Sequence, residues 1–186
     1  MRSELVLLAG LSALASLGSC KQEVRTMDKR ELKEGTQAPD FTAATGEGNE
    51  LSLRAFRART VVLYFYPKDH TPGCTREACS FRDAQAELRQ LGVAVLGVSR
   101  DDPKSHHGFA QKHSLNFPLL ADPQGLIVAA YGVEKTPGIA GAPGQGTERS
   151  TFLIDGDGVI RRIWRNVRVD GHVDEVLAAV RELHGR

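Results

Sequence analysis

Residues 61–79 read VVLYFYPKDHTPGCTREAC, and this stretch decides the central unit of the fold. Its first six residues form an unbroken apolar and aromatic run that ends at Pro67, which is typical of a strand covered on both faces. Thr71 is a suitable N-cap, and Pro72 suits the first helical position, where the N–H that proline lacks would have no partner. The stretch predicts a buried strand, a short loop and a helix whose first turn contains Cys74.

Strands and helices alternate beyond this unit. Residues 93–98 and 151–154 are further apolar runs, and the second continues through an Asp-Gly-Asp-Gly turn into 159–164, which predicts a hairpin. Val159 occupies a ligand position of the calcium loop that this turn superficially resembles, so we favour the turn. The alternation predicts one α/β domain, a three-layer sandwich with a central mixed sheet flanked by helices. Helical spacing covers 78–91, 103–113 and 173–183, and residues 134–148 are expected to form a surface loop.

Composition narrows the classes of function. A chain of 186 residues with 41% hydrophobic content suits a single domain with a real core. The 24 basic and 23 acidic residues give a net charge of +1, so no electrostatic case exists for a nucleic-acid partner. The cysteine spacing is wrong for a zinc pair, and we expect neither a metal nor a cofactor. His106, His107 and His113 are expected to face solvent.

The N-terminus differs in character from the rest of the chain. Residues 5–18 are almost wholly apolar but too short to cross a bilayer, and we interpret residues 1–19 as a signal peptide. Leu17 to Cys20 resembles a bacterial lipobox, in which the cysteine becomes lipidated. Residues 20–34 would form a charged tether and 35–186 the folded domain, held at the cell envelope, in the periplasm, by lipid alone. The alternative is that Met27 is the true start and the protein is cytoplasmic.

Cys74 has the surroundings of a reactive cysteine. In the first turn of a helix its sulfur faces unpaired amides and the positive end of the helix dipole, which favour a thiolate. Complete ionisation raises the thiolate population of an ordinary thiol by about 30-fold at pH 7, worth ~2 kcal/mol. Efficient catalysis by a thiolate needs much more, so hydrogen-bond donors and a fixed positive charge are expected near the sulfur.

A family resemblance supplies candidates for these groups. Pro67, Thr71 and Cys74 match the peroxiredoxin active-site pattern, and the sequence around them resembles the Q-type, or bacterioferritin-comigratory, subgroup over roughly residues 35–183. The resemblance implies a thioredoxin-like fold and an active-site Arg149, carried in Arg-Ser-Thr-Phe-Leu-Ile-Asp. It further implies that Thr71 bonds the thiolate and the substrate oxygen, Arg149 stabilises thiolate and leaving group, and Pro67 shields the pocket from water.

The same resemblance implies a reaction and its partners. Cys74 would reduce hydrogen peroxide or an organic hydroperoxide and become a sulfenic acid, which then closes a disulfide with Cys79 and is recycled by thioredoxin or a thioredoxin-like reductant. Five helical residues place the two Cα atoms ~8.7 Å apart, beyond the ~7 Å limit for a disulfide. We therefore expect the first turns of this helix to unwind during turnover. A monomer or weak dimer is expected.

Other interpretations remain at this point. A membrane-tethered copper-handling protein of thioredoxin-like fold would use two cysteines and a histidine, although its cysteines are separated by three residues and these by four. Disulfide exchange of the thioredoxin type needs Cys-x-x-Cys, which is absent from this sequence. Individually, Cys79 could be an inert core residue, Thr71 a helix cap and nothing more, and Arg149 an ordinary surface residue.

Overall fold

The computed structural model describes residues 32–135 and 146–185. Its main element is a seven-stranded mixed sheet of order β2-β1-β5-β4-β3-β8-β9. The three central strands β5, β4 and β3 are parallel, and the remaining neighbours pair antiparallel. The strands are β1 (Thr42–Thr45), β2 (Glu50–Ser52), β3 (Thr60–Phe65), β4 (Val93–Ser99), β5 (Leu119–Ala121), β8 (Ser150–Ile154) and β9 (Ile160–Trp164).

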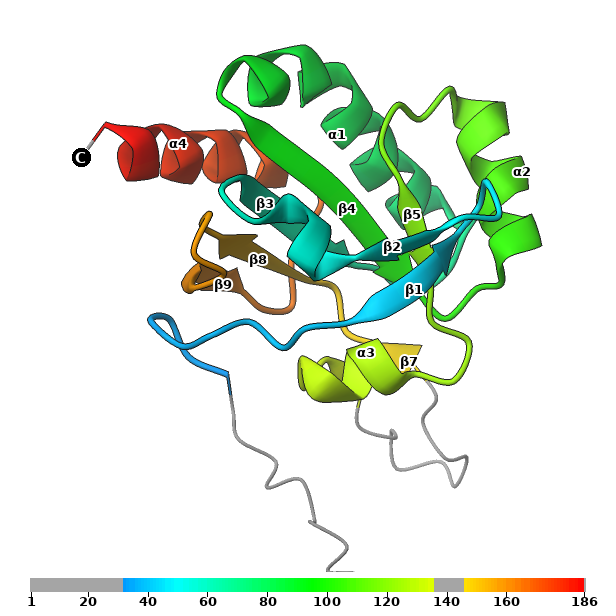
Figure 1. Ribbon diagram of the computed structural model, residues 1–186. Helices are drawn as coiled ribbons and strands as arrows, with labels where there is room; N and C mark the ends of the chain where they lie inside the picture. Colours follow the sequence, from blue (N-terminus) through cyan, green and yellow to red (C-terminus); the bar gives the residue numbers. More distant parts are fainter. Residues whose placement is uncertain (1–31, 136–145, 186) are drawn as a thin grey trace, which may run out of the picture. The chain divides into compact units, whose positions relative to one another are not determined.

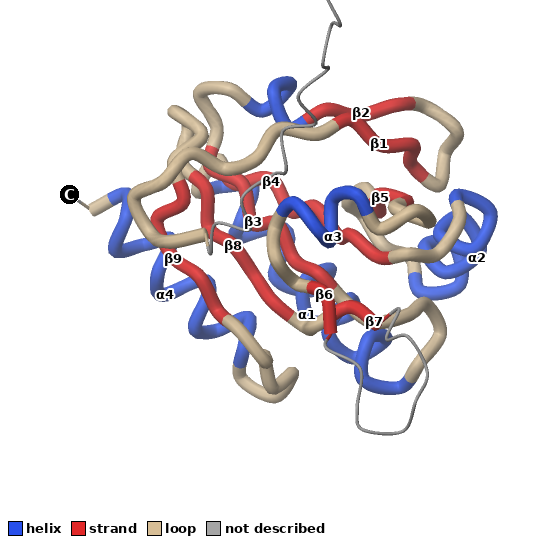
Figure 2. The backbone as a smooth tube through the Cα atoms, turned by 90° about the horizontal axis from the view of Figure 1, so that it is seen from below, coloured by secondary structure: helices blue, strands red, loops and turns tan. Residues whose placement is uncertain are grey.

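Helices cover both faces of this sheet (Figure 1). One face packs against α1 (Pro72–Gln90), α2 (Pro103–His113) and α4 (His172–His184). The other face packs against α3 (Leu126–Ala130) and the 3-10 helix η1 (Leu53–Phe56). Figure 2 shows α3 in front of the sheet and α1 behind it. The three-layer α/β architecture predicted from the sequence is confirmed.

The central strand β3 is buried along its whole length because it supplies both cores. Val62 and Tyr64 point into the cluster formed with α1 and α4, whereas Leu63 and Phe65 point into the cluster on the α3 side. Their exposed fractions are all 0%. Alternate residues of a strand face opposite sides, so a strand covered on both sides must be apolar at every position.

The ends of the helices follow local sequence signals. Helix α1 has Thr71 as its N-cap and ends before Gly92, which adopts a left-handed φ of +71°. The carboxylate of Asp102 accepts the Ser105 N–H at 2.8 Å and caps α2. Strands β8 and β9 form the predicted hairpin, and Asp155 accepts N–H groups within its turn.

The loop predicted over residues 134–148 contains more structure than expected. Its described ends form a two-stranded ladder between β6 (Glu134–Lys135) and β7 (Gly146–Thr147). The Glu148 N–H also donates to the Val133 carbonyl at 2.7 Å. These bonds connect the end of α3 to the segment that enters β8.

The prediction that His106 faces solvent is wrong. His107 is exposed and His113 is half-buried, but His106 has an exposed fraction of 0%. Its ring contacts the buried carboxylate of Asp69 at 2.9 Å. A buried imidazole needs polar partners, and the sequence pattern of α2 does not reveal a carboxylate that comes from a distant loop.

The predicted leader lies outside the described residues. Residues 1–19, Cys20 and Met27 all fall before residue 32, together with most of the tether. Within the described part of the chain, none of the helices has the length and apolar content needed to cross a bilayer.

We expect Gly97→Ala to destabilise the domain by about 1–3 kcal/mol, since inserting a methyl group into a close-packed core forces its neighbours to move. A Cβ at position 97 would lie 2.7 Å from the Tyr64 ring and 2.8 Å from Leu119. The Tyr64 ring is itself stacked on Phe81 of α1, with 4.8 Å between ring centroids. Urea unfolding measures the effect.

Gly108→Ala is the matched control, because nothing lies within 4 Å of a Cβ at that position of α2. Alanine there should stabilise the helix by up to about 1 kcal/mol. Equal unfolding midpoints for the two variants would contradict the packing argument.

Candidate active site

Cys74 is the third residue of α1 and has an exposed fraction of 1%. The first turn of a helix leaves N–H groups without partners and carries the positive end of the helix dipole. Pro72 occupies the first position of the helix, as predicted. The sulfur is therefore buried in a place that presents positive electrostatic potential to it.

Arg149 reaches this sulfur from a different part of the chain. It directly precedes β8, whose first residue Ser150 pairs with Phe65 at the end of β3. This register places Arg149 beside the point where the chain leaves β3 for α1. Its Nη2 donates to Cys74 Sγ at 3.2 Å, and a Cβ on Gly73 would lie 3.4 Å from the same nitrogen. A fixed positive charge therefore lies against the sulfur, and its catalytic role stays a prediction.

Glu77 is a site residue that the sequence analysis missed. Its carboxylate forms an ion pair with Nη1 of Arg149, and its side chain is 1% exposed. Residues three apart share a helix face, so the spacing from Cys74 was a usable signal. The second oxygen, Oε1, is buried without a hydrogen-bond partner in the described part of the chain. Burial raises the pKa of Glu77 to about 7, although the charge and hydrogen bond of Arg149 act in the opposite direction.

Thr71 and Pro67 lie in the loop between β3 and α1. The hydroxyl of Thr71 donates to the Lys68 carbonyl at 2.9 Å and does not cap the helix, although Thr71 holds the N-cap position. Its oxygen retains lone pairs that can accept another hydrogen bond. Pro67 is exposed, two residues beyond the end of β3.

Cys79 follows Cys74 on an unbroken helix. Both cysteines are free thiols, and Cys79 is half-buried. Because α1 is continuous from Pro72 to Gln90, the pair sits at the separation of ~8.7 Å that ideal helix geometry gives. A disulfide between them requires this part of α1 to open.

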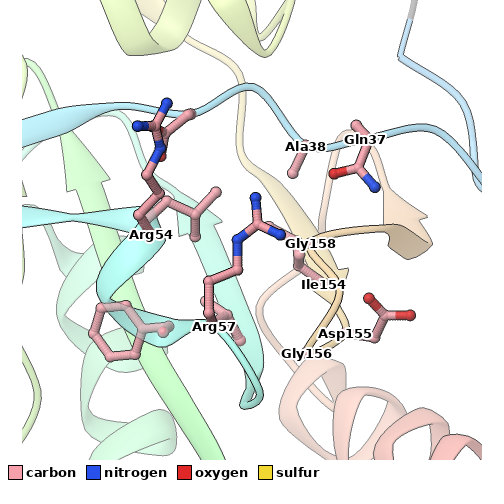
Figure 3. Close-up of a pocket in the computed structure, with 12 residues that line it drawn as sticks. Gln37, Ala38, Arg54, Arg57, Ile154, Asp155, Gly156 and Gly158 are labelled. Carbon is pink, nitrogen blue, oxygen red and sulfur yellow. The ribbon is translucent and has the colours of Figure 1, made fainter.

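A small cavity lies at the other end of β8. Figure 3 shows it beside Ile154, Asp155 and Arg57, whereas Arg149 precedes the first residue of the strand. Its volume of about 30 Å³ is the space of roughly one water molecule. Its lining contains none of Cys74, Thr71 and Arg149, so this cavity is separate from the candidate active site.

The chain matches a known family over most of its length. The model of the AhpC/TSA family matches residues 35–163. A putative peroxiredoxin bcp of Coxiella burnetii is 49% identical over 146 residues, which cover 78% of this chain and 97% of that protein. Peroxiredoxin Bcp of Bacillus subtilis is 41% identical over 149 residues, covering 80% and 95%.

Solved structures of peroxiredoxin Q proteins also resemble this chain. Peroxiredoxin Q of Xanthomonas campestris is 40% identical with a TM-score of 0.75, covering 78% of this chain and 92% of that one. A cysteine-to-serine mutant of the Xylella fastidiosa protein is 34% identical with a TM-score of 0.78, covering 84% and 99%. These likenesses confirm the thioredoxin-like fold. With its buried cysteine held against an arginine, the chain belongs to the peroxiredoxin Q/Bcp group of the AhpC/TSA family, the thiol-dependent peroxidases.

Proposed function

We propose that the protein reduces hydrogen peroxide and organic hydroperoxides through a sulfenic acid at Cys74 and a disulfide between Cys74 and Cys79. The observation that carries this proposal is the contact of 3.2 Å between the Arg149 guanidinium and Cys74 Sγ. A cation in contact with a buried sulfur stabilises a thiolate, and its remaining N–H groups can donate to a developing oxyanion.

The first step oxidises Cys74. The thiolate attacks one peroxide oxygen, the O–O bond breaks, and the sulfur becomes a sulfenic acid. The departing oxygen leaves as hydroxide or alkoxide and takes up a proton to give water or an alcohol. Arg149 stabilises the charge as it moves from sulfur to oxygen, and Thr71 can accept a hydrogen bond from the peroxide O–H.

The second step links the two cysteines. Cys79 attacks the oxidised sulfur, an S–S bond forms, and the S–O bond breaks to release water. The separation of the two residues on α1 requires the first turns of the helix to unwind before this attack. A dithiol reductant of the thioredoxin type then returns both cysteines to thiols by exchange.

The substrate class draws support from a relative. The Xanthomonas campestris bacterioferritin comigratory protein is described as having alkyl peroxide reduction activity. We extend that class to this chain, together with hydrogen peroxide. The copper-handling alternative has no support, because the relatives that match are peroxiredoxins.

The deciding experiment treats the reduced protein with one equivalent of hydrogen peroxide in a stopped-flow instrument, followed by peptide mass spectrometry. We expect rapid loss of two thiols and a crosslink between Cys74 and Cys79. In Cys79→Ser the first step should persist, and Cys74 should accumulate as a sulfenic acid. Reaction of the wild-type protein no faster than a free thiol would overturn the proposal.

Arg149→Lys should lower the second-order rate constant for oxidation of Cys74 by about 100-fold, the usual cost of losing one donor at a developing oxyanion. Lysine keeps the positive charge near Glu77 but cannot contact the carboxylate and the sulfur with two parallel arms. Arg161→Lys, in β9 where Arg161 pairs with Asp155, is the matched control and should leave the rate unchanged.

Glu77→Gln should change how stability depends on pH. The folded protein holds a proton on Glu77 up to about pH 7, whereas the unfolded chain releases it near the ordinary glutamate pKa of 4.5. The wild-type free energy of unfolding, relative to that of the variant, should therefore fall as pH rises from about 4.5 to about 7 and level off above.

Denaturant titrations at several pH values measure this difference. Glu87→Gln is the control, since it makes the same change at a partly exposed position of α1. A wild-type curve parallel to that of Glu77→Gln would show that the buried carboxylate does not titrate in this range.

A further inference from the structure

A second buried pair lies beneath the loop that joins β3 to α1. Asp69 belongs to this loop and His106 to α2, and their side chains are 1% and 0% exposed. The Nδ1 atom of His106 lies 2.9 Å from Oδ2 of Asp69. The reaction outlined above uses neither residue.

Polar groups surround the carboxylate of Asp69. The Tyr66 hydroxyl donates to Oδ1 at 2.8 Å, and the Ser105 hydroxyl donates to Oδ2 at 2.7 Å. The backbone N–H of Asp69 donates to the carboxylate of Asp101 at 2.9 Å. Residue 69 is therefore attached through both its side chain and its backbone to the segment that begins α2.

The His106 ring is fixed through both of its nitrogens. Its second nitrogen, Nε2, lies 3.1 Å from the Leu120 carbonyl oxygen, so both nitrogens face acceptors. Burial raises the pKa of Asp69, but the hydrogen bonds and charge of its neighbours, His106 first, hold it below its ordinary value. An ionised carboxylate thus faces a ring that is held at both nitrogens.

The loop between β3 and α1 has little regular backbone hydrogen bonding of its own and depends on contacts with α2. The Tyr66 N–H still pairs with the Val98 carbonyl, and regular helix bonds begin at the Thr75 N–H. Between them His70 adopts a left-handed φ of +59°, a conformation that costs a non-glycine residue about 1 kcal/mol or more. The His70 ring packs edge-on against Phe109 of α2, with 5.1 Å between centroids.

We propose that the buried Asp69–His106 pair is a positioning element of the peroxidase site. It fixes the loop against α2, and the loop in turn sets where α1 begins and where the Cys74 sulfur lies relative to Arg149. The proposal rests on peroxide reduction at Cys74. It assigns the pair no contact with substrate, and the pair acts through the backbone of residues 67–73.

The chemistry makes such positioning consequential. Peroxide cleavage needs sulfur, both peroxide oxygens and the guanidinium in line, and a misplacement of about 1 Å can cost about 100-fold in rate. Alkylation of the same sulfur by iodoacetamide needs no such alignment and depends on access to the thiolate. A positioning pair and a merely stabilising pair therefore have different kinetic signatures.

The test uses Asp69→Asn and His106→Asn, each made in a Cys79→Ser background so that the first step is isolated. The readouts are the rate constant for oxidation of Cys74 by hydrogen peroxide and the rate constant for its alkylation by iodoacetamide. We expect the oxidation rate to fall about tenfold or more, while alkylation stays unchanged or becomes faster. Hydrogen exchange in residues 68–80 should accelerate.

Asp155→Asn is the matched control, a loss of the same charge at the far end of β8, where Asp155 holds the turn and pairs with Arg161. It should lower the unfolding midpoint and leave oxidation of Cys74 at the parent rate. Should either pair variant fail to fold, Ser105→Ala removes one hydrogen bond from the same carboxylate and should slow oxidation in the same sense.

Oxidation at the parent rate in a folded pair variant would overturn the proposal. Equal slowing of oxidation and alkylation in a pair variant would also overturn it. So would a fall in the oxidation rate of Asp155→Asn as large as the fall in the pair variants. The Cys79→Ser parent reports separately on the peroxidase proposal, because slow oxidation there would show that Cys74 is not the peroxide-reactive residue.

Discussion

The candidate active site depends on the contacts of one guanidinium group. Arg149 contacts the sulfur of Cys74 with one arm and the carboxylate of Glu77 with the other, and all three groups are largely removed from water. A buried charge is tolerable only where it is paired. The arginine therefore needs Glu77 to enter the protein interior, and the proposed attack by Cys74 depends on the arginine.

This contact depends on the way the sheet is assembled. Arg149 and Cys74 are 75 residues apart, and they meet because β8 pairs with β3 in a register that sets Ser150 opposite Phe65. The same strand, β3, leads into α1. Strand β3 thus positions both residues. It positions the cysteine through α1, which follows it, and the arginine through β8, which pairs with it. The apolar residues on both faces of β3 keep this arrangement rigid.

The proposed cycle makes opposite demands on the first turns of α1. Attack on a peroxide requires Cys74 buried and aligned, whereas a disulfide with Cys79 requires the helix between them to open. The loop before α1 is attached to α2 through Asp69 and His70, and the helix beyond Cys79 packs into the core through Phe81 and Leu88. The segment able to open lies between these two anchors, which limits the disruption to a few residues.

Much of the fold was readable because long apolar runs and helix signals are local. They predicted β3, α1, β4, α2, the β8–β9 hairpin and α4 nearly to their ends. The short strands β1, β2 and β5 and the short helix α3 gave no comparable signal, since three to five residues are too few for a period to show. The family pattern also led to Cys74 and Arg149.

The sequence by itself determined that a reactive cysteine would lie in the first turn of a helix that follows a buried strand. Capping residues and apolar runs signal this because they act over a few neighbours. Only the tertiary structure decided which groups meet that cysteine and its loop. The spacing of Glu77 from Cys74 was a local signal, but its ion pair with Arg149 is a tertiary contact. The prediction that His106 faces solvent is wrong because Asp69 reaches it from 37 residues away. Such pairs form through strand register and helix packing. A buried charge must be paired, and the packing of distant segments decides which group is near enough to pair with it.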